Sequence, residues 1–204
     1  MFKKLSAILP LFLIFTFISC AKDNNFPNPD LEKKIICFGD SLTQGKGANP
    51  GETYPDFLQQ MTNIPVINLG VSGNTSIQGL ERIDEVINQK AFMVLVEFGA
   101  NDFFKKVPIK DTKQAIEEIV DKLQKTGAVV ILLSTEDTQL PELYNTVKKI
   151  SEDKNTLFID GILNDIWDNR TLFSDTLHPN SDGYKIVAEK IFKKIEPAIK
   201  QQQQ

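Results

Sequence analysis

The chain has 204 residues, of which 41% are hydrophobic and 25% are charged, a balance typical of a globular protein. Its formal net charge is −4, and charges of both signs are spread along the sequence, which argues against nucleic acid as a partner. Once an N-terminal leader is set aside, the length suits one domain with a substantial core. The two cysteines, Cys20 and Cys37, lie in unrelated segments, so no disulfide is predicted.

The N-terminal segment has the pattern of a secretion signal. A short basic opening precedes an apolar run over 5–18, which is too short for a membrane span of about 20 residues and is interrupted by Pro10. The segment 1–19 resembles a bacterial lipoprotein signal peptide, which implies that Cys20 is lipidated and becomes the mature N-terminus. Phe17 stands where Leu is more common in that pattern. An uncleaved anchor and a plain signal peptide are the alternatives, and each also places the body outside the cytoplasm.

The remaining boundaries follow from composition. Residues 20–32 are rich in Asn and Pro and have no apolar period, so they are predicted to form a polar tether after the lipidated cysteine. The folded domain is expected over 33–200, and the glutamines at 201–204 are expected to form a disordered tail. Attachment by more than one acyl chain would hold the protein stably in the bacterial cell envelope, facing the periplasm or at the cell surface. We expect a monomer.

From residue 33 onward, short apolar runs alternate with segments of helical spacing. The clearest helix begins at Thr75, where Thr75 and Gln78 fit a capping box. Alternation of strand and helix implies right-handed crossovers, so we predict an α/β fold: a three-layer α/β/α sandwich, flavodoxin-like, around a five-stranded, mostly parallel sheet. Strands are expected at 34–38, 65–69, 92–98, 128–134 and 156–160, and helices at 53–61, from 75 to about 87, and at 110–125, 140–152 and 181–199.

The first predicted strand runs directly into Gly-Asp-Ser-Leu at 39–42. Because ligands bind at the carboxyl ends of parallel strands, Ser41 is a candidate nucleophile. The alternative is a serine that caps the following helix. Cys37, inside the apolar strand, is predicted to be a buried hydrophobe. Asp40 is expected to support the turn by accepting backbone hydrogen bonds.

Three later segments bring polar groups to the same predicted edge of the sheet. The second strand ends at Gly70, the third is followed by Asn101, and the only histidine of the chain, His178, stands three residues after Asp175. Each has a structural alternative: a strand-ending glycine, a turn or helix cap for Asn101 and Asp175, and a structural histidine. Their joint occurrence at one edge favours a functional site.

These blocks, in this order, resemble the GDSL or SGNH hydrolases over residues 34 to about 195. The similarity is greatest to the branch that contains lysophospholipases, acyl-CoA thioesterases and arylesterases, although Asn74 stands where members of that branch often carry Asp. The four blocks are at 39–42, 70, 99–102 and 175–178, and the similarity to the branch lies at 39–43, 73–76 and 96–99.

The resemblance implies a serine esterase of SGNH fold that needs no metal and no organic cofactor. In that family pattern Ser41 is the nucleophile, His178 is the base and Asp175 orients the imidazole. The backbone N–H groups of Ser41 and Gly70 and the side chain of Asn101 would form the oxyanion hole. Because histidine titrates near neutral pH, it can accept the serine proton under ordinary conditions and allow an acyl-enzyme to form.

The expected substrates are small-molecule acyl esters or thioesters, including lysolipids. Phe103 and Phe104 either line an acyl-binding groove or pack in the core. Lys105 and Lys106 either meet an anionic head group or lie in a solvated loop. Two other functions stay open: an O-acetylesterase that acts on acylated glycans of the envelope, and a non-catalytic lipoprotein that binds lipid or sugar on a hydrolase scaffold.

Overall fold

The computed structural model describes residues 31–135 and 140–201. The predicted signal peptide, Cys20 and most of the tether lie outside these ranges. The helix at the C-terminus includes Gln201, which the sequence placed in the tail.

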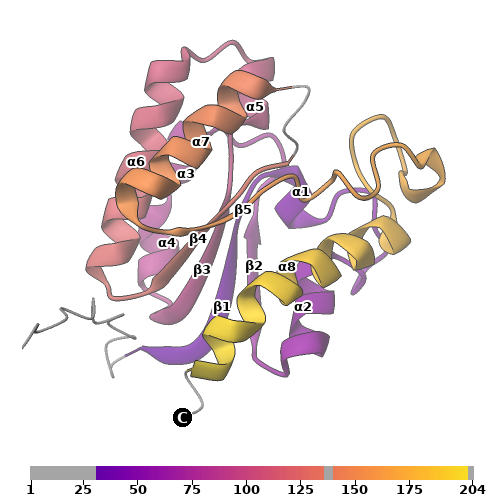
Figure 1. Ribbon diagram of the computed structural model, residues 1–204, viewed down its shortest axis with the longest axis horizontal. Coiled ribbons are helices and arrows are strands. Elements are labelled where there is room, and N and C mark those ends of the chain that lie inside the picture. The colour runs from indigo at the N-terminus through magenta and orange to yellow at the C-terminus, as the bar shows by residue number, and fades with distance from the viewer. Residues whose placement is uncertain (1–30, 136–139, 202–204) are drawn as a thin grey trace, which may run out of the picture.

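Five parallel strands form one sheet in the order β2-β1-β3-β4-β5, with β1, β3 and β4 in the interior (Figure 1). This confirms the predicted α/β fold, and each strand begins and ends within two residues of its predicted bounds. Alternate residues of β1 point to opposite faces of the sheet, so both faces need a layer of helices. The strands are β1 (Glu32–Gly39), β2 (Val66–Gly70), β3 (Ala91–Glu97), β4 (Val129–Leu133) and β5 (Leu157–Ile159).

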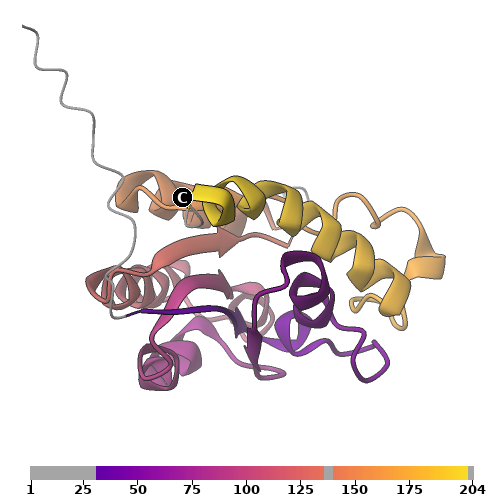
Figure 2. The same cartoon turned by 90° about the horizontal axis from the view of Figure 1, so that it is seen from below.

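The helices form two layers, one on each face. On one face Ile35 and Cys37 pack with residues of α2 (Tyr54–Thr62) and α8 (Ser181–Gln201), which lie against each other (Figure 2). On the other face Ile36 and Phe38 pack with four helices. These four are α3 (Ser76–Glu81), α4 (Ile83–Ile87), α6 (Ile109–Lys125) and α7 (Pro141–Lys154).

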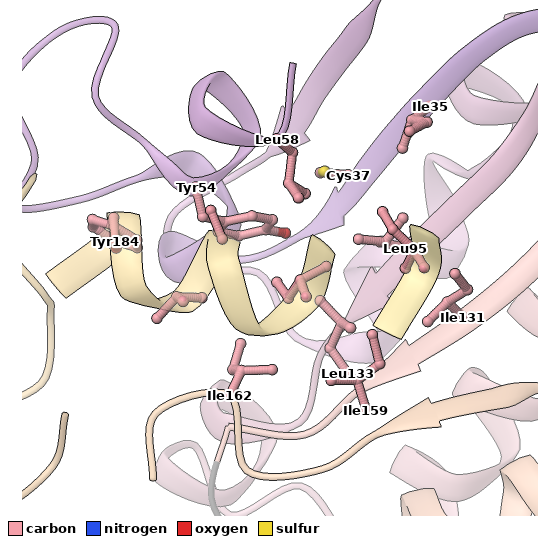
Figure 3. Close-up of a cluster of buried hydrophobic side chains, with 14 of the residues drawn as sticks. Ile35, Cys37, Tyr54, Leu58, Leu95, Ile131, Leu133, Ile159, Ile162 and Tyr184 are labelled. Carbon is pink, nitrogen blue, oxygen red and sulfur yellow. The ribbon is translucent and has the colours of Figure 1, made fainter. Parts of the chain in front are cut away.

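Cys37 lies inside the core beneath α2 and α8. It is fully buried, and its neighbours in the cluster include Tyr54 and Leu58 of α2 (Figure 3). Burial raises the pKa of the Cys37 thiol to about 12, so the thiolate does not form near neutral pH. The prediction that Cys37 is a buried hydrophobe is confirmed.

The helix predicted from Thr75 is two helices. The capping box is present, with reciprocal bonds between Thr75 and Gln78. However, α3 ends at Glu81 and α4 begins at Ile83, and Arg82 between them has a non-helical φ of −110° and ψ of 18°. The regular spacing of apolar residues predicted one continuous face, whereas Ile77 is 37% exposed and Ile83 is buried.

Two short helices were not predicted, and both place residues at the carboxyl edge of the sheet. They are α1 (Ser41–Gln44), after β1, and α5 (Ala100–Phe104), after β3. Neither is long enough to show a helical period in the sequence. No helix within the described ranges combines the length and the hydrophobicity that crossing a membrane requires.

Candidate active site

The serine lies at the first position of α1, directly after β1. The side chain of Asp40 caps this helix, because its Oδ1 accepts the N–H of Leu42 at 3.0 Å. The alternative in which Ser41 is the cap is therefore wrong, and the expected role of Asp40 in the turn is confirmed. The hydroxyl of Ser41 is left to face the cleft.

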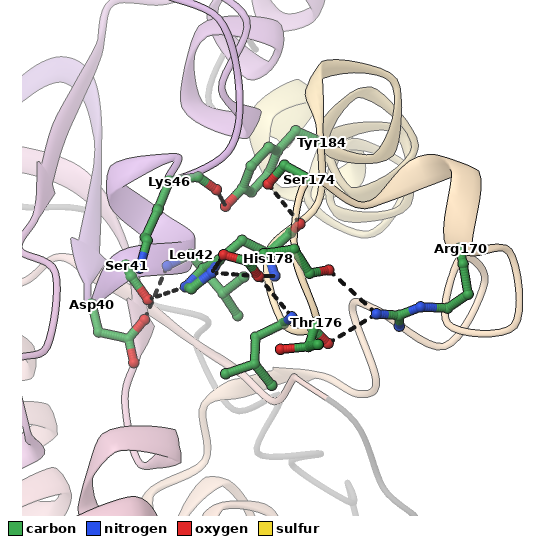
Figure 4. A network of polar contacts seen from close by, with 11 residues as sticks. Asp40, Ser41, Leu42, Lys46, Arg170, Ser174, Thr176, His178 and Tyr184 are labelled. Atoms are coloured by element: carbon green, nitrogen blue, oxygen red, sulfur yellow. Dashed lines mark hydrogen bonds and ion pairs between the residues drawn. The ribbon is translucent and has the colours of Figure 1, made fainter.

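The predicted nucleophile, base and acid are in contact. The Nε2 atom of His178 lies 3.0 Å from Oγ of Ser41, although the two residues are 137 positions apart in the chain (Figure 4). On the other side of the ring, Nδ1 lies 2.8 Å from Oδ2 of Asp175. The arrangement places an imidazole between a hydroxyl and a carboxylate, as nucleophilic catalysis by serine requires.

A tight loop carries the histidine. Phe173 and Pro179 pair as an antiparallel bridge, and the N–H of Ser174 donates to the carbonyl oxygen of His178 at 2.9 Å. The ring of His178 is buried, with 8% of the residue exposed. The bridge holds the imidazole in place from both ends of the loop.

Asp175 serves the loop and the histidine together. Its Oδ1 accepts the backbone N–H groups of Leu177 and His178, each at 2.8 Å. Partial desolvation alone would raise the pKa of Asp175, but these bonds and the bond to the His178 ring outweigh it and lower the pKa to about 2. The capping role and the contact with histidine, which were alternatives in the sequence, occur together.

Arg170 holds the same loop from the outside. Its Nη2 donates to the carbonyl oxygens of Asp175 and Thr176, at 3.3 and 3.1 Å (Figure 4). The guanidinium also lies over the rings of Phe173 and Trp167, at 4.4 and 5.7 Å from their centroids. Nothing in the sequence marked Arg170, because its partners are backbone oxygens.

Asn101 lies on α5 with its amide beside the serine turn. Its Nδ2 donates to Oδ2 of Asp40 at 2.7 Å, and an amide nitrogen carries a second hydrogen that remains for a ligand. The neighbouring residue Asp102 points the other way and is buried, accepting bonds from Ser76 and Thr112. Asn101 thus belongs to the cleft and Asp102 to the core.

The prediction that Gly70 is part of the oxyanion hole is wrong, because Gly70 does not lie in the site. The N–H of Gly70 donates to the side chain of Asn68 at 2.9 Å. Gly70 instead packs against α1, where a Cβ atom would lie 2.1 Å from the backbone nitrogen of Gln44. This close approach explains the glycine, and its N–H is not directed at a substrate.

Gly73 takes the place that was expected for Gly70. It lines the cleft together with Ser41 and Asn101, and its φ of +80° favours glycine. Within the described ranges, the N–H groups of Gly73 and Ser41 have no protein acceptor. The sequence analysis included Gly73 in the similarity at 73–76 but did not assign it to the oxyanion hole, although it stands two residues before Thr75, the N-cap of α3.

The cleft above the serine has a volume of about 600 Å³. Phe103 and Phe104 line it and are 57% and 56% exposed, so they do not pack in the core. Lys105 is exposed, as the solvated-loop alternative expects, and its Nζ donates to the carbonyl oxygen of Gly73 at 2.6 Å. Other apolar residues that line the cleft are Leu42, Leu140, Leu163, Trp167 and Leu177.

A buried glutamate lies beneath the serine turn. Glu97, the last residue of β3, is 1% exposed, and its Oε2 accepts bonds from Thr43 Oγ1 at 3.1 Å and from the N–H of Asp40 at 3.4 Å. Burial, together with the nearby carboxylate of Asp40, raises the pKa of Glu97 well above its ordinary value. A charged residue that ends an apolar strand was the signal available in the sequence.

The arrangement as a whole suits acyl transfer. A hydroxyl is bonded to an imidazole, a carboxylate orients the imidazole, and the N–H groups of Ser41 and Gly73 and the amide of Asn101 lie on the same cleft. Within residues 31–135 and 140–201 there is no group of three or more His, Cys, Asp and Glu side chains that could hold a metal ion.

Similar proteins carry related names. Thioesterase 1/protease 1/lysophospholipase L1 of Escherichia coli (strain K12) is 24% identical over 203 residues, which cover 93% of this chain and 91% of that protein. An arylesterase of Vibrio mimicus is 24% identical over 77% of this chain and 85% of its own length. The psychrotrophic esterase EstA from Pseudoalteromonas sp. superposes with a TM-score of 0.75 at 26% identity, over 83% of this chain and 100% of that chain.

Residues 37–186 match the GDSL-like Lipase/Acylhydrolase family, a span that includes the serine turn, the cleft and the histidine loop. The parallel sheet and the contact between serine and histidine are on the same segment. The chain therefore belongs to the GDSL-like lipase/acylhydrolase family and is a carboxylic ester hydrolase of the SGNH type.

Proposed function

We propose that this protein hydrolyses acyl esters and thioesters through an acyl-enzyme formed on Ser41. The observation that carries the proposal is the hydrogen-bonded series from Ser41 through His178 to Asp175 at the base of an apolar cleft. The names of the similar thioesterase/lysophospholipase and arylesterase support the same reaction class.

The geometry supports a two-step reaction. As Oγ of Ser41 attacks the substrate carbonyl carbon, Nε2 of His178 takes the hydroxyl proton, and the positive imidazolium is stabilised by Asp175. The N–H groups of Ser41 and Gly73 and the free amide hydrogen of Asn101 are the donors for the oxyanion. The proton on His178 then passes to the leaving alcohol or thiol.

The second step releases the acid. A water molecule gives its proton to His178 as it attacks the acyl carbon on Ser41, a second oxyanion forms at the same donors, and the serine leaves with the proton from His178. The carbonyl oxygen carries the charge in both steps, so the same donors serve each. No other reactant is needed.

The apolar walls of the cleft favour a substrate with an acyl chain longer than acetyl. Phe103 and Phe104 offer ring surface beside the serine, and Trp167 and Leu177 line the cleft as well. A lysophospholipid, an aryl ester or an acyl thioester fits these features. An O-acetylesterase of envelope carbohydrate is the competing assignment, and it predicts a preference for the shortest chain.

We also propose that the protein is a lipoprotein of the bacterial cell envelope, anchored through Cys20. The support is in the sequence alone: a basic opening, an apolar run over 5–18, and a small residue, Ser19, before the cysteine. An acyl-ester hydrolase at that address would lie close to lipid substrates.

The test is hydrolysis of p-nitrophenyl esters of graded chain length by a protein that begins after Asn25, measured beside Ser41→Ala. We expect wild-type activity that the substitution removes, with a higher kcat/KM for chains longer than acetyl. A preference for acetate would favour the acetylesterase. A folded wild type that hydrolyses none of the esters, with Ser41→Ala still binding lipid or sugar, would contradict the enzymatic proposal.

A further inference from the structure

Arg82 joins three segments that lie beside the nucleophile. It stands between α3 and α4, its side chain is 13% exposed, and its guanidinium lies 4.4 Å from the ring centroid of Phe38. Its Nη2 donates to the carbonyl oxygen of Gly39 at 3.0 Å, its Nη1 to that of Leu69 at 2.9 Å, and its Nε to Oδ1 of Asn74 at 2.8 Å. One side chain thus holds the ends of β1 and β2 and the loop that follows β2.

Two of the residues that accept bonds from Arg82, Gly39 and Asn74, are close in sequence to proposed oxyanion donors. Gly39 is the last residue of β1, two positions before Ser41, and Asn74 directly follows Gly73. The N–H groups of Ser41 and Gly73 come from separate segments of the chain. Their separation therefore depends on what holds the loop after β2 against the serine turn.

The bonds of Arg82 are not those of an ordinary ion pair. The one carboxylate that comes within 4 Å of its guanidinium, among the described residues, belongs to Glu85, at 3.9 Å and with 61% of the side chain exposed. The three guanidinium nitrogens instead donate hydrogen bonds to neutral oxygens, two of backbone carbonyl groups and one of an amide side chain. Charge-assisted bonds are stronger than neutral ones, and the planar guanidinium fixes their directions.

We propose that Arg82, with Asn74 as its side-chain partner, is a positioning residue that sets the distance between the oxyanion donors of Ser41 and Gly73. The inference rests on the esterase function proposed above. A misplacement of about 1 Å can lower a rate by about 10²-fold, so the loss of Arg82 is expected to lower kcat. A merely structural role would lower stability and leave the turnover of the folded protein unchanged.

The test compares Arg82→Met, which keeps an apolar stem and removes all three donors, with wild type. We expect kcat for p-nitrophenyl acetate to fall about 10- to 100-fold, while KM changes less than about threefold, because the donors act on the transition state. A folded Arg82→Met protein with the wild-type kcat would overturn the inference.

Lys154→Met is the matched control. Lys154 forms an ion pair with Asp121 at 2.6 Å between α6 and α7, near the amino end of β5 and away from the serine. Its loss is expected to lower thermal stability with kcat unchanged. A drop in kcat for this variant equal to that of Arg82→Met would show a general effect of lost packing, and it too would overturn the inference.

A second pair of variants decides the question if Arg82→Met does not fold. Asn74→Ala removes one acceptor of Arg82, and Asn74→Asp keeps an oxygen in its place. We expect kcat to fall several-fold in Asn74→Ala, of the order of one lost positioning bond, and to be higher in Asn74→Asp than in Asn74→Ala. Wild-type kcat in Asn74→Ala would overturn the inference.

The wild type separates the two proposals. If it hydrolyses no ester, the proposed function falls and the inference falls with it. If it is active and folded Arg82→Met is equally active, the inference alone falls.

Discussion

Asp175 is ionised at a lower pH than the range in which histidine side chains change charge. Hydrogen bonds lower the pKa of Asp175 to about 2, so its carboxylate is negative throughout the range in which histidine side chains titrate. His178 must be neutral to accept the proton of Ser41. The pH dependence of the reaction is therefore expected to report the histidine and not the aspartate.

We expect kcat/KM to rise with pH through the ionisation of the histidine, with no step from Asp175 above about pH 3, since Asp175 is already ionised there. His178→Ala should lose both this rise and most of the rate. Asp175→Asn should lower kcat by about 10³–10⁴-fold, because the imidazolium loses its carboxylate. The measurement is a pH profile of ester hydrolysis for the three proteins, and a His178→Ala enzyme with full activity would contradict the assignment.

The last residue of β3, Glu97, is a buried carboxylic acid that takes no part in the proposed reaction. Glu97 is buried under α1 with Asp40 and Thr43 facing it, and Tyr54 of α2 lies 3.0 Å from the same threonine hydroxyl. Because its pKa is raised in the folded state, the folded protein holds a proton that the unfolded chain releases above about pH 4.3. This glutamate therefore makes the fold less stable as pH rises, until it ionises in the folded state too.

Glu97→Gln tests this effect, since glutamine has the same shape and no proton to lose. The free energy of unfolding of wild type, relative to Glu97→Gln, should fall by up to about 1.4 kcal/mol per pH unit as pH rises above about 4.3. The measurement is urea unfolding between pH 4.5 and 8. Glu189→Gln, on the exposed side of α8, is the control and should follow wild type at every pH. Parallel curves for Glu97→Gln and wild type would show that the glutamate is ionised in the fold.

Much of the architecture could be predicted from local pattern. Strands that are buried on both faces have continuous apolar runs, so the five strands were visible with small errors at their ends. The residues Ser41, Asp175 and His178 could be predicted because each stands in a short motif at a strand end or loop. Their contact in space was implied by the parallel sheet.

The remainder depends on tertiary contacts that a sequence does not display. Gly70 and Gly73 stand three positions apart in one strand-end segment, and what separates them is a close approach to Gln44 at one and a positive φ at the other. The break at Arg82 arises where a side chain reaches two strand ends, which the helical period of Ile77 and its neighbours could not reveal.

At the scale of the whole molecule, we propose that the hydrolase domain and the N-terminal segment serve separate purposes. The sheet, both layers of helices and the cleft are all formed by residues 31–135 and 140–201. The proposed anchor at Cys20 precedes all of them in the chain. Loss of the proposed anchor is therefore expected to change where the protein is found without changing its ester hydrolysis.

Cys20→Ser tests that separation in cells. The substitution removes the thiol that would carry the lipid, so the protein should move from the membrane fraction to the soluble envelope fraction while the ester hydrolysis of the body is retained. The measurement is fractionation followed by immunoblotting and an esterase assay, with wild type alongside. Equal membrane association of both proteins would contradict anchoring through Cys20.

The contact between Ser41 and His178 spans 137 positions of the chain. The serine is available as soon as the first strand and turn have been made, whereas the histidine follows only after all five strands, shortly before α8. A nascent chain, or one truncated anywhere before the final loop, contains the hydroxyl but lacks the base that activates it. The chain can therefore hydrolyse esters only when its synthesis is nearly complete. Activity also shows that the N-terminal and C-terminal parts of the domain have folded against each other.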